Sequence, residues 1–195
     1  MPYPDRMARW QPNASERLVL AALELFEERG YEATTVVGIA ERAGLTKSTF
    51  FRHFPDKREV LFGGDAMAGL LADGIAAAPA GSPPSAAIAH ALDAVGRDVF
   101  HAERRAFGAR RRAVILAHPE LREREALKGI GLTEAMRAAL ERRGVAALTA
   151  RAAAELGALA MTIAYEHWTD TPGGEEFGAV ARRTLAEVRE AGAAF

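Results

Sequence analysis

Four side chains near the end of the first quarter of the chain combine chemistries suited to contacting DNA. Two are cations, one is a hydroxyl and one is an aromatic ring, and their spacing of i, i+1, i+4 and i+5 places them on one helical face: Lys47, Ser48, Phe51 and Arg52. Phe50 and Phe54 lie four residues apart, so they are expected to pack inward. A helix with such a polar outer face fits the major groove, where cations reach phosphates and base edges. The stretch therefore predicts a DNA-recognition helix.

The surroundings of this helix are basic, although the chain as a whole is not. The 195 residues carry a formal net charge of −1. Residues 42–58 nevertheless contain five basic side chains against a single acid, Asp56: Arg42, Lys47, Arg52, Lys57 and Arg58. Attraction to phosphates supplies much of the affinity for DNA, so a local surplus of positive charge favours this function. The alternative is a helical hairpin whose charged face is merely solvated.

Two short helices separated by a glycine are expected to position the recognition face. An apolar stripe at i, i+3, i+4 and i+7 predicts the first of them: Val36, Ile39, Ala40 and Ala43. Thr34 or Thr35 is expected to cap its start, and Thr46 the start of the recognition helix, through hydroxyl groups that accept first-turn amides. Gly44 stands where a left-handed residue commonly ends a helix. Helix, glycine turn and helix together form the helix-turn-helix pattern.

A longer helix ahead of this pair is expected to complete a three-helix unit. Asn13 and Glu16 are spaced as a capping box at its start, and Gly30 follows its end. The residues before it, Met1–Pro12, contain three prolines and two arginines, so an N-terminal arm is expected there in place of a helix. A basic arm could contact DNA, and a leader without any role is the alternative.

Residues in the expected helix-turn-helix and on either side of it form a distinctive combination: Gly30, Tyr31, Thr34, Thr35, Ile39, Ala40, Ala43, Gly44, Thr49, Phe51, His53, Phe54 and Lys57. This combination closely resembles the N-terminal signature of TetR-family transcriptional regulators, and the resemblance extends over about Leu18–Leu61. It implies an all-helical, homodimeric, ligand-responsive repressor that binds a double-stranded DNA operator in the cytoplasm.

The resemblance also implies which residues touch DNA. By matching position, the family's DNA contacts fall on eight residues: Thr35, Lys47, Ser48, Thr49, Phe51, Arg52, His53 and Lys57. Two positions depart from the usual pattern. Phe51 replaces a tyrosine, which removes a hydroxyl able to reach a phosphate but keeps an aromatic face for a thymine methyl. Gly38 lies inside the first helix of the pair, where glycine costs about 1 kcal/mol relative to alanine.

The composition of the whole chain favours an all-α fold of about nine helices. Hydrophobic residues make up 49% of the sequence, and helix formers such as alanine, leucine, glutamate and arginine dominate it. The absence of cysteine fits a reducing cytoplasm and excludes disulfides and thiolate chemistry. The N-terminus lacks the apolar core of a signal peptide, and charges interrupt the apolar runs, so no membrane-spanning segment and no membrane partner are expected.

The helix-turn-helix is expected to be joined to a larger helical domain by one continuous helix. Pro55 ends the recognition helix, and Asp56 is expected to cap a fourth helix that runs to about Ala78 and acts as the lever for a ligand signal. Gly63–Gly64 is a candidate flexing point or a weak place in that helix. The sequence thus predicts an arm and DNA-binding domain over residues 1–58 and a ligand-binding and dimerisation domain over 59–195. Further helices are expected over about 84–102, 104–117, 120–143, 149–169 and 175–191.

The last two of these helices are expected to form a two-fold dimer interface, because their apolar faces are rich in small residues and no later helix can cover them. The alternative is that they pack only within one monomer. A small, mostly apolar ligand is expected to bind between the fourth and eighth helices. The candidate contacts are the apolar and aromatic residues there, each of which also fits an ordinary core position: Met67, Leu71, Leu92, Phe107, Leu116, Met136, Met161, Tyr165 and Trp168.

A run of five arginines in the expected sixth helix has two interpretations: Arg104, Arg105, Arg110, Arg111 and Arg112. One is a solvated basic face, and the other is a site for the anionic part of a ligand. The segment from Arg110 to Val145 is loosely similar to the effector region of TetR-family regulators thought to respond to acyl-CoA-like ligands. That weaker resemblance implies phosphates held by the arginines and an acyl chain held in the apolar interior.

Neither a metal site, a cofactor nor an enzyme is predicted. The five histidines include no pair at the i, i+3 or i, i+4 spacing of helical metal ligands. The sequence contains no glycine-rich phosphate loop, no nucleophile elbow and no cysteine. The alternative to a regulator is a helical small-molecule-binding or scaffolding protein without DNA binding.

Overall fold

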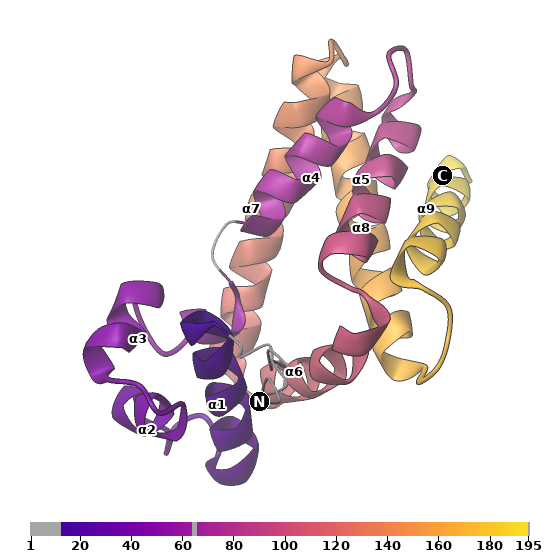
Figure 1. Cartoon of the computed structure of the whole chain (residues 1–195). Helices are drawn as coiled ribbons and strands as arrows, with labels where there is room; N and C mark the ends of the chain where they lie inside the picture. Colours follow the sequence, from indigo (N-terminus) through magenta and orange to yellow (C-terminus); the bar gives the residue numbers. More distant parts are fainter. Residues whose placement is uncertain (1–12, 64–65, 195) are drawn as a thin grey trace, which may run out of the picture. The chain divides into compact units, whose positions relative to one another are not determined.

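The computed structural model describes residues 13–63 and 66–194, and all regular structure within these ranges is helical (Figure 1). Nine α-helices and two short 3-10 helices follow one another there without a strand. The prediction of an all-α fold is confirmed. The chain divides into two compact units, one ending at Leu61 and the other beginning at Phe62.

The first unit is a three-helix bundle built from α1 (Ala14–Arg29), α2 (Val36–Arg42) and α3 (Lys47–His53). The Asn13 side chain caps α1 by accepting the backbone N–H of Glu16 at 3.0 Å, as the capping-box spacing predicts. Its core is formed by side chains that all three helices contribute and that are fully enclosed: Leu18, Leu23, Ile39 and Phe50. The N-terminal arm predicted over Met1–Pro12 lies outside the described residues.

The continuous fourth helix predicted from Asp56 onward is not present. The Asp56 carboxylate accepts the backbone N–H groups of Arg58 at 2.7 Å and Glu59 at 3.1 Å, and so caps only a single 3-10 turn, η1 (Glu59–Leu61). Gly63 then adopts a positive φ of 63°, a left-handed conformation that cannot continue a right-handed helix. The helix α4 runs over Ala66–Ala77, while Gly64, half of the predicted flexing point, lies outside the described residues.

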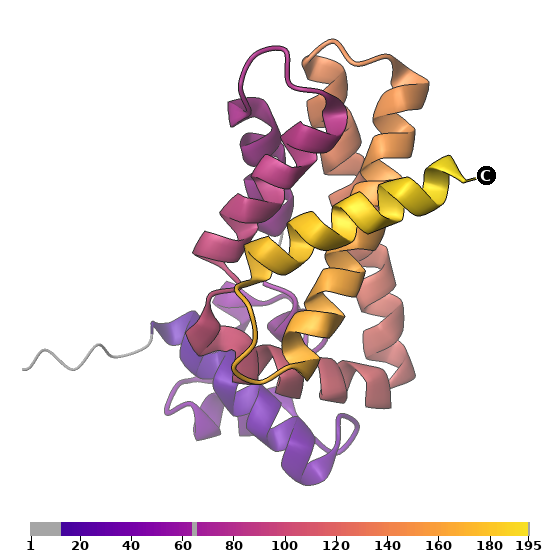
Figure 2. The same cartoon turned by 90° about the vertical axis from the view of Figure 1, so that its right-hand side faces the viewer.

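Five longer helices follow α4 in the second unit, with η2 (Ala102–Arg104) ahead of the second of them: α5 (Pro84–Asp98), α6 (Arg105–Ala117), α7 (Pro119–Arg142), α8 (Ala147–Asp170) and α9 (Phe177–Ala193). Helix α5 packs against α4 and α9, and α8 packs against α7 and α9. Figure 2 shows α9 crossing the face of the bundle formed by α5 and α8.

Glycines allow the helices of this unit to approach closely at two crossings. A Cβ atom at Gly74 of α4 would lie 2.6 Å from Cα of Ala91 on α5. A Cβ atom at Gly96 of α5 would lie 2.9 Å from the backbone nitrogen of Gly178 on α9. Both distances are too short for a Cβ atom. The packing of α5 between α4 and α9 therefore depends on glycine, which carries only a hydrogen at these two positions.

Arginines tie the ends of helices to neighbouring segments in the same unit. Arg143, just after α7, donates to backbone carbonyls in the last turn of α4 and just beyond it: Ala76 at 3.2 Å, Ala78 at 2.9 Å and Pro79 at 2.8 Å. Arg105 at the start of α6 is buried and donates to the carbonyls of Thr171, Gly174 and Glu175 between α8 and α9. Its guanidinium also lies 5.2 Å from the ring centroid of Trp168.

The expectation that no apolar run reaches membrane-spanning length is wrong when segments are judged by their length and composition alone. Two segments, Glu59–Ala77 and Ala147–Asp170, are long and apolar enough to cross a membrane. Alanine and scattered large aliphatic residues raise the mean hydropathy of α8 although charges interrupt it. A core helix passes the same test, and α8 buries a full row of small residues in the bundle: Ala150, Ala154, Gly157, Ala160 and Ala164.

Two glycines in α4 are expected to respond in opposite ways to the same substitution. Gly69→Ala adds a Cβ that meets no atom within 4 Å, so it should raise the free energy of unfolding by up to about 1 kcal/mol through helix propensity. Gly74→Ala forces α4 and α5 apart and should lower it by about 1–3 kcal/mol. Urea unfolding of both variants measures the difference. Equal shifts would contradict the close α4–α5 crossing.

Candidate nucleic-acid interface

The recognition helix α3 begins and ends as its sequence predicts. The Thr46 hydroxyl accepts the backbone N–H of Thr49 at 3.1 Å, and Thr46 itself has the extended backbone typical of an N-cap. Gly44 in the turn before it has a positive φ of 64°. The N–H of Leu45 reaches back to the carbonyl of Ala40 at 2.8 Å, which closes the C-terminus of α2.

The two threonines that were alternatives for the cap of α2 have different roles. Thr35 is the cap, because its hydroxyl accepts the backbone N–H of Gly38 at 3.0 Å. Thr34 is buried and donates to the carbonyls of Gly30 at 2.8 Å and Leu25 at 3.2 Å. Thr34 thereby joins α2 to the end of α1, while Thr35 stays exposed at the N-terminus of α2.

The recognition helix has the two faces that its spacing predicts. Phe50 and Phe54 are buried, with ring centroids 5.6 Å apart. The outward face carries exposed side chains that belong to the predicted DNA contacts: Lys47, Ser48, Phe51, Arg52 and His53. Phe51 keeps 48% of its surface in solvent, which is unusual for a phenylalanine and leaves its ring available to a partner. Thr49 lies between the two faces and is half-buried.

Much of the local positive charge is neutralised within the unit. Arg42 pairs with Glu24 at 3.2 Å and Glu28 at 2.7 Å, and its hydrogen bond lowers the pKa of Glu28. Arg58 pairs with Asp56 at 3.1 Å. Within residues 13–63, Lys47 and Arg52 of α3 are by contrast exposed cations that form no ion pair. Two of the exposed cations that form no ion pair in this unit therefore lie on the recognition helix itself, and Arg29 at the end of α1 is another.

Lys57 occupies a different environment from the other predicted contacts. Its ammonium donates to the carbonyls of Tyr31 at 2.7 Å and Thr34 at 3.1 Å, and it lies 3.9 Å from the ring centroid of Tyr31. These contacts hold the segment between α1 and α2 against the chain that follows α3. Two of the three ammonium donors are thus used inside the unit.

Arg17 is a positioning residue that sequence reasoning missed. It lies on α1, yet its guanidinium donates to the carbonyl of Ala43 and approaches that of Gly44 at 3.5 Å, so it bridges α1 to the turn of the helix-turn-helix. A single arginine on a long amphipathic helix gives no periodic signal. Only the three-dimensional packing of α1 across α2 reveals the contact.

The nine predicted ligand contacts differ in their burial. Four of them are fully buried core residues, namely Leu71, Leu92, Met136 and Trp168. Leu116 is 51% exposed, and the other four are half-buried. Two hollows of about 690 and 400 Å³ lie elsewhere, one between α7 and α8 and one beside α1, and none of the nine residues lines either of them.

The arginines of the α6 segment are largely engaged within the chain. Arg111 pairs with Glu125 at 3.2 Å and lies 5.2 Å from the ring centroid of Phe62. Arg112 pairs with Asp170 at 2.9 Å and Glu166 at 3.4 Å. Together with Arg105, which holds the α8–α9 connection, three of the five arginines already have strong partners.

Tyr165 lies close to this arginine cluster. Its hydroxyl donates to the carbonyl of Gly108 at 3.2 Å, and burial raises the pKa of the phenol while the charge of Arg111 opposes that shift. Tyr165 belongs to an aromatic cluster with Phe100, Trp168 and Phe177. The ring centroids of Phe100 and Tyr165 are 4.9 Å apart. A neutral phenol amid aromatic rings is suited to an apolar ligand or an uncharged acceptor.

A capped helix-turn-helix with an exposed cationic recognition face defines the first unit as a DNA-binding domain of the helix-turn-helix class. Residues 18–62 match the family described as bacterial regulatory proteins, tetR family. This match confirms, over the N-terminal segment, the resemblance seen in the sequence.

Curated relatives match a segment of similar length. The transcriptional regulator TcmR of Streptomyces glaucescens is 53% identical over 45 residues, which are 23% of this chain and 20% of TcmR. The transcriptional activator FasR of Mycolicibacterium smegmatis is 43% identical over 44 residues, again 23% of this chain and 20% of that protein. The aligned part thus spans about a fifth of each relative.

Solved structures share the fold over nearly the whole chain. NalD, the secondary repressor of the MexAB-OprM multidrug efflux pump in Pseudomonas aeruginosa, superposes with a TM-score of 0.56 at 18% identity, covering 91% of this chain and 94% of NalD. The SmeT–triclosan complex also gives a TM-score of 0.56 at 18% identity, covering 92% of this chain and 91% of SmeT. Because the superposition extends over more than nine tenths of the chain, the second unit shares its fold with these two proteins.

The two lysines of the helix-turn-helix should differ in their effect on stability. Lys57→Met removes two charge-assisted bonds to backbone carbonyls and should lower the free energy of opening around Tyr31–Thr35 by about 2 kcal/mol. Lys47→Met removes an exposed charge and should change it by less than about 0.5 kcal/mol. Amide hydrogen exchange of α2 in the full chain measures both. Equal exchange rates in the two variants would show that Lys57 does not hold this segment.

Proposed function

We propose that the protein is a ligand-responsive transcriptional repressor that binds a palindromic DNA operator as a homodimer in the cytoplasm. The observation that carries the proposal is the outward face of α3, where Lys47, Arg52 and Phe51 are exposed on a helix anchored from behind by buried phenylalanines. A helix of this kind fits the major groove, and a two-fold dimer presents two of them to half-sites about 34 Å apart.

Within this proposal the side chains of α3 make different kinds of contact with DNA. Lys47 and Arg52 contact bases or phosphates, because each is a cation without an ion pair in the described part of the unit. Phe51 meets a thymine methyl. The hydroxyl and imidazole groups at the edge of this face contact phosphates or nearby base edges: Thr35, Ser48, Thr49 and His53. Lys57, in place of a direct phosphate contact, fixes the segment that presents α2.

The ligand proposed for the second unit is small, mostly apolar and uncharged, and it binds among α4–α8. Apolar and aromatic side chains dominate that region, with Tyr165 and Met161 half-buried beside the core. An acyl-CoA-like ligand that bound through Arg111 or Arg112 would have to displace a carboxylate partner of that arginine with a phosphate. An uncharged ligand needs no such exchange, so the structure favours it.

Arg111 connects the proposed ligand region to the start of the second unit, so a conformational change caused by the ligand can pass through it. It interacts with Tyr165, pairs with Glu125 and stacks on Phe62, the first residue after the DNA-binding unit. We propose that a ligand which displaces Tyr165 shifts Arg111 and with it Phe62. The change then passes through the covalent connection and spoils the spacing of the two recognition helices.

Removal of the two exposed cations of α3 should weaken operator binding. Lys47→Ala and Arg52→Ala are each expected to reduce affinity about tenfold or more, because each deletes a contact to a base or a phosphate. If the lost contact is to a phosphate, the slope of log affinity against log salt concentration should fall by about 1. Fluorescence anisotropy with labelled DNA across a salt series measures both quantities.

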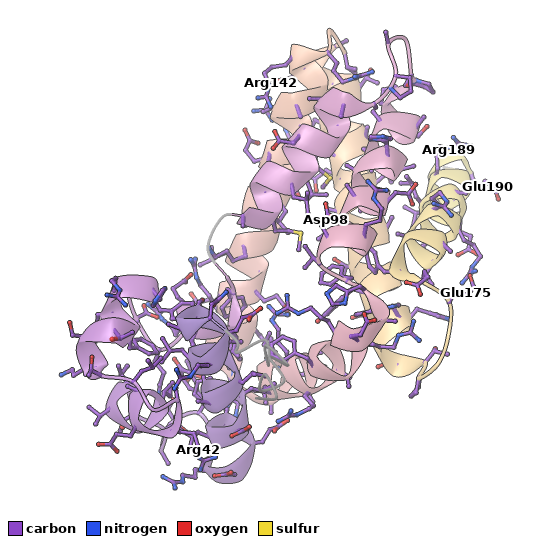
Figure 3. All side chains as sticks on the ribbon, viewed as in Figure 1. Arg42, Asp98, Arg142, Glu175, Arg189 and Glu190 are labelled. Atoms are coloured by element: carbon purple, nitrogen blue, oxygen red, sulfur yellow. The ribbon has the colours of Figure 1, made fainter. Side chains whose placement is uncertain are left out.

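The matched control is Arg142→Ala, which removes an exposed cation at the end of α7 and should leave DNA affinity unchanged (Figure 3). The DNA is taken from upstream of the protein's own gene, with a scrambled sequence for comparison. Binding that prefers the native sequence and depends on Lys47 and Arg52 supports the regulator. Operator affinity unchanged by both α3 substitutions would refute the proposed recognition face.

A further inference from the structure

Two enclosed N–H groups in the second unit have no hydrogen-bond acceptor within the described part of the chain. One is the indole Nε1 of Trp168 on α8, and the other is the guanidinium Nε of Arg105 on α6. Trp168 is 1% exposed and Arg105 is 8% exposed. A buried donor without an acceptor has lost its hydration and gained nothing in exchange, so such groups are uncommon in folded proteins. Both donors are therefore candidates for binding a group from outside the chain.

The two donors lie in the same neighbourhood. The guanidinium carbon of Arg105 is 5.2 Å from the ring centroid of Trp168, within the range of a cation–π contact. The terminal nitrogens of Arg105 donate to three carbonyls of the α8–α9 connection, those of Thr171, Gly174 and Glu175. These bonds fix the guanidinium, so its Nε–H stays near the indole. Three carbonyl oxygens and the indole ring also stabilise the charge of Arg105 without a carboxylate.

Phe100 is the central ring of the aromatic cluster that surrounds this neighbourhood. Its ring centroid lies 4.8 Å from that of Phe177, 4.9 Å from that of Tyr165 and 5.7 Å from that of Trp168. Trp168 and Phe177 are buried, whereas Phe100 and Tyr165 are half-buried. A ring in the position of Phe100 therefore contacts the three other rings and still reaches solvent.

Phe100 belongs to a connection between helices and not to a helix. Helix α5 ends at Asp98, which Figure 3 labels, and η2 begins at Ala102. The backbone N–H of Phe100 bonds to the carbonyl of Val95 at 3.0 Å, which ties the connection to the last turn of α5. Rotation of the Phe100 side chain out of the cluster breaks none of these backbone bonds. The ring of Phe100 is thus a plug that an aromatic molecule can replace.

The rings and the two donors define the chemistry of the molecule that would take this place. Aromatic rings attract one another at centroid distances of about 4.5–7 Å, so a flat aromatic ligand keeps the contacts that Phe100 makes. One carbonyl oxygen has two lone pairs, which matches the two N–H groups that lack an acceptor. The charge of Arg105 already faces three carbonyl oxygens, so the ligand needs no charge of its own.

We propose that the second unit binds an uncharged aromatic carbonyl compound in the place of the Phe100 ring, with the carbonyl oxygen accepting the N–H groups of Trp168 and Arg105. The inference rests on the proposed function for the existence of a small uncharged ligand. It adds the chemical group that the site recognises and the residue that closes the site. Departure of Phe100 also removes a ring beside Tyr165, which interacts with Arg111.

Three naphthalene derivatives, substituted at the same ring position, test the carbonyl group. Methyl naphthyl ketone carries the carbonyl oxygen, ethylnaphthalene has the same shape without it, and naphthoate has a carboxylate. The ketone should bind the full wild-type chain at least about tenfold more tightly than ethylnaphthalene, because only the ketone supplies an acceptor to the buried donors. Naphthoate should bind no more tightly than the ketone. Equilibrium dialysis measures the three dissociation constants.

The indole N–H resonance of Trp168 reports the contact directly in proton–nitrogen NMR spectra. The sequence contains two tryptophans, so the variant Trp10→Phe leaves Trp168 as the only indole. The ketone should move the proton resonance downfield relative to ethylnaphthalene, since both probes carry the same ring and only the ketone accepts the N–H. Equal shifts with the two probes would contradict the hydrogen bond.

Two variants and one control separate the donor from the plug. Trp168→Phe keeps an aromatic ring but removes the N–H, so the preference for the ketone should fall to about threefold or less. Phe100→Ala removes the plug, and the ketone should bind at least about threefold more tightly because no ring has to be displaced first. Leu159→Ala deletes an exposed apolar side chain of α8 and should leave the affinity unchanged.

The outcomes distinguish this inference from the proposed function. A ketone preference in the wild type that disappears in Trp168→Phe supports the site. Equal affinity for the ketone and ethylnaphthalene, or no binding of either to wild type and Phe100→Ala, would overturn it while the DNA-binding proposal stands. Tighter binding of naphthoate would overturn the uncharged ligand both here and in the proposed function. A ketone that binds as expected but leaves operator affinity unchanged would support the site and refute its role in the proposed ligand response.

Discussion

Cationic side chains complete the backbone hydrogen bonding that the short helices leave unfinished. Every helix ends with carbonyls that have no partner within it, and here lysine or arginine supplies donors at several of these places. Arg17 serves the turn after α2, Lys57 the segment between α1 and α2, Arg143 the end of α4, and Arg105 the connection after α8. Each donor comes from an element distant in sequence, so each bond also fixes tertiary structure. The cations left over for an external partner are therefore few, and in the first unit two of them, Lys47 and Arg52, lie on α3.

Periodic and capping signals made the first unit predictable from its sequence. Thr46 and Gly44 are local determinants, since each acts on atoms within a few residues, and the buried pair Phe50 and Phe54 follows from helical spacing alone. The prediction of one long connecting helix was wrong. The apolar spacing from Leu61 onward is helical, but the left-handed backbone of Gly63 interrupts the helix. Lys57 was assigned by position to a phosphate, and its two carbonyl partners become evident only when α1 and α3 are packed together.

The second unit was predictable as helices but not as a site. Its helix bounds follow from prolines, glycines and apolar stripes, which are local. Its proposed ligand residues were chosen as apolar side chains, and core and pocket residues share that chemistry, so sequence alone does not separate Leu92 in the core from Leu116 on the surface. The same holds for the small residues of α8, which serve close packing inside the bundle. Surface exposure separates these residues, and the sequence does not encode it directly.

The break after Leu61 has a consequence for how such a regulator can evolve and be engineered. The first unit encloses its own core, with Val60 and Leu61 of η1 as its last buried residues. A recombination event near Gly63 would therefore exchange one complete DNA-reading module for another without exposing either core. The residues that face DNA and the interior residues of the second unit can then change independently. The family match over residues 18–62, beside a second unit whose likeness to NalD and SmeT is one of fold, fits such a division.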